Sequence, residues 1–179
     1  MAEQHSSRVW LMRVLYVGLV IALIFMHLLP LESAPSRIAP PDVIIALTFA
    51  WAMRRPEYVP ALSVGLVALL ADLLLQRPPG LMAALTVIGA ETLRARAQSN
   101  REVHFMIEWA TVAGVIIAVS LTSRIALSTL IVPTAPWGMA LLQTALTIAI
   151  YPIVVLISRF LFGVSKPAPG EINAMGQRI

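Results

Sequence analysis

The stretch that decides the fold is IALSTLIVPTAPWGMALLQTALTIAIYPIVVLIS, residues 125–158, which carries no charged side chain over 34 residues. A helix needs roughly 20 mostly apolar residues to cross a bilayer. The stretch is therefore too long for one span, and Pro133 and Pro136 mark the natural break within it. We expect one membrane-spanning helix to end before these prolines and another to begin after them.

The composition of the whole chain leads to the same class of protein. Of its 179 residues, 59% are hydrophobic and only 12% are charged, whereas soluble domains are about 45–50% apolar. The net charge of +4 rests on few groups, so the basic balance does not indicate a nucleic-acid partner. The absence of cysteine excludes disulfides, thiolate metal sites and cysteine nucleophiles.

Six apolar segments reach or approach the length of a membrane span. They cover residues 10–31, 41–53, 57–75, 79–93, 103–124 and 137–162. The uncharged run of the first segment exceeds the 7–15 residues of a signal-peptide core, so we interpret it as an anchor. The second and fourth are short and are expected to pack inside the bundle or to rely on snorkelling arginines. The sequence thus predicts an all-α, six-span membrane domain over residues 10–162, between polar tails at 1–9 and 163–179.

The basic residues are distributed unevenly between the two ends of this expected bundle. The end shared by both termini has Arg8, Arg13, Arg54, Arg55, Arg94, Arg96, Arg101, Arg159, Lys166 and Arg178, and the other has only Arg37, Arg77 and Arg124. Since basic loops stay on the cytoplasmic side, we expect both termini in the cytoplasm. Trp10, Trp51, Tyr58 and Trp137 are expected near the two interfaces, where amphipathic rings prefer to lie.

Besides Glu57, four acidic residues fall within or at the ends of the expected spans, where ionisable groups are costly and are candidates for function. Asp42 and Asp72 are expected at the outer level, and Glu91 and Glu108 near the inner level, with hydroxyl and small residues between them. Ion-coupled transporters typically place their site near the midplane. This two-layer arrangement therefore argues against ion-coupled transport.

The partners of these carboxylates are less closely defined by the sequence. For Asp72 two interpretations stay open, pairing with an outer arginine or contact with another subunit. Glu91 and Glu108 are expected to reach water or to pair with Arg94 or Arg101.

Ala110, Gly114 and Ala118 recur at four-residue spacing in the fifth segment and form a smooth stripe on one helical face. Helices in lipid associate by close packing of such small residues. Two interpretations stay open: the stripe packs within the bundle itself, or it receives a helix of a partner protein.

The sequence contains no complete motif of an enzyme active site or of a cofactor site. The segment ALSVG, residues 61–65, approaches a G-x-S-x-G nucleophile elbow but lacks its first glycine and its strand-to-helix context. The sequence contains no P-loop, no dinucleotide fingerprint and no metal-spaced cluster. We therefore expect a protein that is not an enzyme and that needs no cofactor or metal.

Two proline-rich turns connect the expected helices. The inner turn is WAMRRPEYVP, residues 51–60. In it Arg54 and Arg55 suit the negative end of one helix and anionic lipid, and Pro56 and Glu57 suit the start of the next. The outer turn is QRPPG, residues 76–80. Both are expected to form rigid hairpins.

Taken in order, Pro41-Asp42, the turn from Trp51 to Tyr58, Asp72, and Pro79-Gly80 resemble the MreD family of bacterial rod shape-determining proteins. The resemblance covers the six-segment layout of nearly the whole chain. One departure is Ala68, since many members carry glycine a turn before the acidic residue.

The resemblance implies a non-enzymatic inner-membrane scaffold of the cell-wall elongation complex, needed for rod shape and peptidoglycan synthesis. The implied partners are an MreC-like bitopic protein, the MreB filament, the polymerase RodA and its transpeptidase. On this hypothesis Arg54, Arg55 and Glu57 form the inner contact or a lipid-facing anchor. Asp42, Asp72 and Pro79-Gly80 shape the outer contact.

The resemblance also implies a fold similar to the substrate-binding subunits of energy-coupling-factor vitamin transporters, which supply the alternative function. Those subunits dock on their energising module through an Ala-x-x-x-Ala stripe in the first helix. Here the first segment contains only Ala22. The sequence also predicts no polar pocket of vitamin size.

Overall fold

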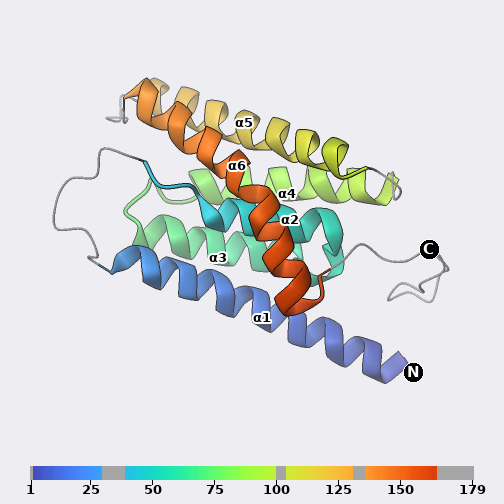
Figure 1. Ribbon diagram of the computed structural model, residues 1–179. Coiled ribbons are helices and arrows are strands. Elements are labelled where there is room, and N and C mark those ends of the chain that lie inside the picture. The colour runs from blue at the N-terminus through green and yellow to red at the C-terminus, as the bar shows by residue number, and fades with distance from the viewer. Residues whose placement is uncertain (1, 30–38, 100–103, 131–135, 165–179) are drawn as a thin grey trace.

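The computed structural model describes residues 2–29, 39–99, 104–130 and 136–164, and within these ranges it contains helices and no strand. The six α-helices are α1 (Ala2–Leu28), α2 (Val43–Arg54), α3 (Ala61–Leu74), α4 (Leu81–Ser99), α5 (Phe105–Thr129) and α6 (Trp137–Phe162), and a short 3-10 helix, η1 (Pro56–Tyr58), follows α2. Figure 1 shows their arrangement. The all-α prediction is confirmed.

Several helix boundaries differ from the predicted segments, and α5, for example, ends at Thr129 rather than at residue 124. Helix α1 begins at Ala2, so most of the expected N-terminal tail continues the first helix, and α4 extends to Ser99 rather than to residue 93. The third helix begins at Ala61 instead of Glu57, because Pro60 disfavours helical geometry in the residue before it. Of the expected tail at 163–179, residues 165–179 lie outside the described residues.

The surface of the bundle is rich in exposed apolar side chains. Part of α1 (Ser7–Leu28) and the whole of α5 and α6 are long and apolar enough to cross a membrane. Large exposed side chains lie on α1, α3, α5 and α6, and include Phe25, Leu62, Leu66, Leu73, Ile107, Ile125, Leu141 and Phe160. Soluble monomers rarely expose so much contiguous apolar surface, so these faces are compatible with contact to lipid.

Helix α2 lies at the centre of the bundle. It contacts α1, α4, α5 and α6, and every residue from Ile45 to Arg54 is buried. Its 12 residues extend only about 18 Å, less than the roughly 30 Å of a bilayer core. The surrounding helices therefore separate this short helix from lipid, as its length led us to expect.

The two ends of the bundle can be followed in Figure 1. Helix α1 begins and α6 ends at the same end, where α2 turns into α3 and α4 approaches α5. We call this the terminal end. At the other end, the opposite end, helices α2, α4 and α6 begin.

Pro152 interrupts the hydrogen-bond ladder of α6. Because proline has no backbone N–H, the carbonyl of Ile148 loses its donor four residues later. Trp109 of α5 replaces that donor, since its indole Nε1 donates to the Ile148 carbonyl oxygen at 3.0 Å. An unsatisfied backbone carbonyl in hydrocarbon costs several kcal/mol. The contact therefore accommodates the proline and joins α5 to α6.

We expect Trp109→Phe to lower the free energy of unfolding by about 1 kcal/mol in mixed micelles, because the Ile148 carbonyl is left without a donor. In a Pro152→Ala background the loss should largely disappear, since the alanine restores the backbone N–H. Titration with a denaturing detergent measures both values, and Trp10→Phe, at an exposed indole, is the control. Equal losses in the two backgrounds would contradict this account.

Candidate functional site

The aromatic residues of the turn after α2 are buried in the bundle. Trp51 and Tyr58 are 0% and 4% exposed, and Trp51 Nε1 donates to Ser158 Oγ of α6 at 3.0 Å. These two rings therefore pack within the bundle at its terminal end, because neighbouring helices cover the turn. Trp10 and Trp137 are exposed, as an interfacial ring should be.

Two arginines from other helices fix the backbone of the same turn. Arg94 Nη2 of α4 donates to the carbonyl oxygens of Pro56, at 3.2 Å, and of Val59. Arg13 Nε of α1 donates to the Glu57 carbonyl oxygen at 2.9 Å. Side chains from two other helices thus donate to three carbonyls of the turn, and these contacts tie the turn to α1 and α4.

A buried charge cluster joins α2, α5 and α6 near the terminal end. Arg54 Nε donates to Glu108 Oε1 at 2.8 Å and Nη2 lies 3.4 Å from Oε2, while Tyr151 Oη donates to Oε1 at 2.9 Å. Glu108 is 0% exposed. The expected partner is corrected here, since Glu108 meets Arg54 instead of Arg94, and Arg101 lies outside the described residues.

The cluster changes the role expected of Arg54. Because its side chain is buried against Glu108, it does not form a lipid-facing anchor. Arg55 and Glu57 remain partly exposed, with 3.4 Å between Nη1 and Oε1. They are therefore the remaining candidates for the expected inner contact. Glu91 pairs with Arg94 as expected, at 2.7 Å between Oε1 and Nη1.

Asp72 caps helix α4 across the turn at the opposite end. Its Oδ2 accepts the backbone N–H groups of Gly80, at 3.0 Å, and Ala83, at 3.1 Å. Gly80 has φ +86°, which glycine adopts without strain, and Pro79 precedes it. The predicted arginine pair is wrong, because the unpaired N–H groups of a helix start satisfy this carboxylate. Asp72 is 1% exposed, so it is too buried to contact another subunit.

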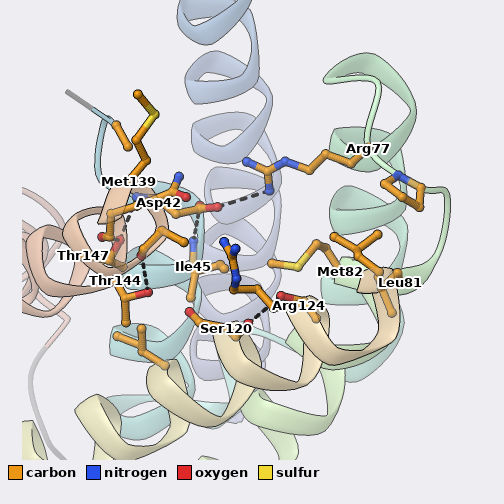
Figure 2. Close-up of a pocket in the computed structure, with 17 residues that line it drawn as sticks. Asp42, Ile45, Arg77, Leu81, Met82, Ser120, Arg124, Met139, Thr144 and Thr147 are labelled. Carbon is orange, nitrogen blue, oxygen red and sulfur yellow. Dashed lines mark hydrogen bonds and ion pairs between the residues drawn. The ribbon is translucent and has the colours of Figure 1, made fainter. Parts of the chain in front are cut away.

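Asp42 ties together three elements at the same end. Its Oδ1 accepts the Ile45 N–H at 3.2 Å and so caps α2, and its Oδ2 lies 3.2 Å from Arg77 Nη1. Its own backbone N–H donates to Thr147 Oγ1 of α6 at 2.9 Å. Figure 2 shows these contacts. The predicted neighbourhood of Asp42 and Arg77 is confirmed.

A cavity of about 340 Å³ opens beside Asp42, between α2, α4, α5 and α6 (Figure 2). Its apolar wall includes Ile45, Leu81, Met82, Ile116, Leu127 and Met139, and its polar wall Asp42, Arg77, Ser120, Ser123, Arg124, Gln143, Thr144 and Thr147. Its volume lies within the roughly 300–1,000 Å³ of ligand pockets. The expectation that no polar pocket of vitamin size exists is therefore wrong.

The signal for this cavity was present in the sequence. Polar residues recur about one turn apart at the end of α5, from Ser120 to Arg124, and at the start of α6, from Gln143 to Thr147. Two helices joined by a short connection run antiparallel, so these stretches face one another. None of these polar side chains indicates a cavity by itself. They indicate one only when α5 and α6 are considered as a packed pair.

The small-residue stripe of α5 faces away from the bundle. Ala110, Gly114 and Ala118 are all exposed, and a Cβ atom added at Gly114 would meet nothing within 4 Å. The interpretation that this stripe packs within the bundle is therefore wrong. The stripe is a smooth outer face on a helix long enough to cross a membrane.

Within the described ranges, no group of three or more histidine, cysteine or acidic residues is placed to hold a metal ion. Comparison of the chain with protein-family models, with curated proteins and with solved structures finds no match.

We expect Glu108→Gln to destabilise the protein by about 3–5 kcal/mol, because it leaves the Arg54 charge buried without its counter-ion. The matched control is Glu91→Gln, which removes a partly exposed pair worth under about 1 kcal/mol. Detergent-induced unfolding followed by tryptophan fluorescence measures both. Similar losses for the two variants would refute the distinction between the pairs.

For Asp72 we expect a graded response. Asp72→Ala should cost about 1–2 kcal/mol because the α4 cap is lost. Asp72→Asn should cost only about 0.5 kcal/mol, since an amide oxygen still accepts the N–H groups and only the charge at the helix start is removed. The measurement is the unfolding free energy of both variants. Equal destabilisation would indicate that charge, not capping, is the function of this carboxylate.

Proposed function

We propose that this chain is a non-enzymatic membrane scaffold of the MreD type, which binds an MreC-like bitopic protein in the bacterial cell-wall elongation complex. The observation that carries the proposal is the exposed stripe of Ala110, Gly114 and Ala118 on α5. Small residues let two helix backbones approach closely in lipid, so this face suits the single transmembrane helix of such a partner.

The shape of the face supports docking of a helix. Ile107 and Leu121, which stand about one turn before and after the stripe, are both exposed and large. Between them the helix surface at Gly114 is open, since an added Cβ atom would meet no atom within 4 Å. Close van der Waals packing on such a small-residue face is a main attraction between helices in lipid.

The residues that carry the family resemblance have identifiable structural roles. Trp51 fills the core, and Asp42 and Asp72 cap helices at the opposite end. Gly80 closes the turn before α4. These residues favour a shared fold because each one fixes a helix start or the packing of the central helix.

The proposal places all six helices in the inner membrane, with both termini in the cytoplasm. Support comes from the exposed leucines of α3, which would face lipid although that helix is short. The described basic residues also gather at the terminal end, namely Arg8, Arg13, Arg54, Arg55, Arg94, Arg96 and Arg159, against Arg77 and Arg124 at the opposite end. Such an excess is typical of a cytoplasmic side.

In this role the protein performs no bond chemistry. Its partner's helix lies along α5, which links the cytoplasmic side, where an MreB filament assembles, to the outer side, where RodA and its transpeptidase act. The rigid turn after α2 and the capped turn before α4 hold the bundle in one shape. A rigid platform limits the entropy that a partner loses on docking.

A second candidate, the substrate-binding subunit of an energy-coupling-factor transporter, is favoured by the cavity of about 340 Å³. Against it stands the first helix, whose apolar span has only Ala22 where such subunits carry an alanine stripe. The two functions differ in what the tagged protein retains on purification. A scaffold retains an MreC-like protein, whereas a transporter subunit retains a small vitamin and an ATPase module.

To test the scaffold, Gly114→Leu should reduce co-purification of the MreC-like protein at least about ten-fold, because the leucine keeps the partner helix from approaching the α5 backbone closely. The matched control is Gly18→Leu, at an exposed glycine of α1 that also has open space around it. Both variants should fold and run as the parent protein in size-exclusion chromatography. Undiminished capture by the Gly114 variant would overturn the docking face.

A further inference from the structure

The cavity at the opposite end is not needed by a scaffold. We propose that it binds an amphipathic anion, a molecule with a negatively charged head group and an apolar body. The inference does not depend on the identity of any protein partner, since it concerns only groups that line this cavity.

The positive charge of the cavity wall comes from two guanidinium groups. Arg77 enters from the turn before α4 and Arg124 from α5, and Figure 2 shows Arg124 reaching toward the pair formed by Asp42 and Arg77. A guanidinium carries five N–H donors, so Arg77 can hold Asp42 through Nη1 and a ligand oxygen through its other nitrogens. The Cζ atom of Arg124 lies 4.3 Å from the ring centroid of Trp137, and the five donors of its guanidinium allow it to hold a ligand oxygen in addition to its partners in the protein.

Two hydroxyl groups of the wall do not compete for the role of donor. Thr144 Oγ1 donates to the Ala140 carbonyl oxygen at 2.8 Å, and Ser123 Oγ donates to the Ser120 carbonyl oxygen at 2.9 Å. Their protons are therefore used within their own helices, and they offer lone pairs to a ligand. Charged donors for an anion are concentrated at the two arginines, which prefer phosphate or carboxylate oxygens.

The rest of the wall fits an apolar body. Ile45, Met82, Ile116 and Met139 line the cavity from all four surrounding helices. The volume of about 340 Å³ equals that of about eleven waters at roughly 30 Å³ each, enough for a head group with a short apolar body. Such a ligand could come from the adjacent lipid leaflet or from water, and the chemistry of recognition is the same.

The experiment uses the full chain in dodecyl maltoside micelles and follows binding by calorimetry. Octyl phosphate is the probe for the whole ligand, with inorganic phosphate as head alone and octanol as body alone. We expect saturable binding of octyl phosphate, with an affinity at least about ten-fold above either part. Equal binding of the three probes, or no saturable binding of octyl phosphate, overturns the proposal.

Two pairs of variants locate the binding. Arg124→Gln should weaken binding about ten-fold, whereas Arg96→Gln, at an exposed arginine of the terminal end, should not. Ala140→Phe fills the cavity without changing charge, and its control is Ala145→Phe, exposed on another face of α6. If both cavity variants fold and bind octyl phosphate like their controls, the site is elsewhere and the proposal fails.

A second experiment, with lipid, distinguishes a ligand that comes from the bilayer from one that comes from water. The protein is reconstituted in nanodiscs of equal dioleoyl phosphatidylglycerol and phosphatidylcholine, and the lipid that stays bound is counted by native mass spectrometry. Retention of phosphatidylglycerol that both cavity variants abolish supports an anionic lipid. Binding of octyl phosphate without such retention supports a water-soluble amphiphile of the same class.

Discussion

The constraint on which this structure depends is that polar groups surrounded by hydrocarbon must find their partners within the protein. The chain meets this constraint with single side chains placed at helix breaks. Asp72 takes the first N–H groups of α4, Trp109 takes the carbonyl that Pro152 leaves unpaired, and Arg94 takes two carbonyls of the turn after α2. Each contact also joins two elements, so satisfying the backbone and assembling the bundle are one process.

The same constraint makes the two ends of the bundle different. Near the terminal end, Trp51 packs against Tyr16 of α1 and Phe162 of α6, and Tyr151 and Arg54 meet Glu108 between α2, α5 and α6. At the opposite end α2 and α6 meet through the smaller contact of Asp42 with Thr147. Ser123, Thr144 and Thr147 there donate to carbonyl oxygens of their own helices rather than across to α2 or α4. The cavity lies between these helices and is lined by them.

The sequence could predict at which end of the bundle a residue lies, but not how each helix is rotated about its own axis. Segment lengths, proline turns and the shared level of Asp42 and Arg77 follow from hydropathy and position along the chain. The burial of Trp51, the pairing of Glu108 with Arg54 and the outward direction of Ala110 depend on which face each helix turns to its neighbours. The sequence places several arginines at the same end of the bundle as Glu108. It does not show which of them faces Glu108, so it could not decide between Arg94 and Arg54 as the partner. The cavity was hidden for the same reason, because residues of four helices form its wall.

Helix α5 is the element on which the proposed partner and the proposed ligand meet. Gly114 and Ala118 point outward, whereas Ile116 and Ser123 point into the cavity from the opposite face of the same helix. At the terminal end α5 is held by the buried pair of Glu108 with Arg54 and by the bond from Trp109 to the Ile148 carbonyl oxygen of α6. The proposed ligand and the proposed partner helix therefore contact opposite faces of one helix. Any coupling between these two binding equilibria must be reciprocal, so the factor by which the ligand changes the affinity for the partner is also the factor by which the partner changes the affinity for the ligand.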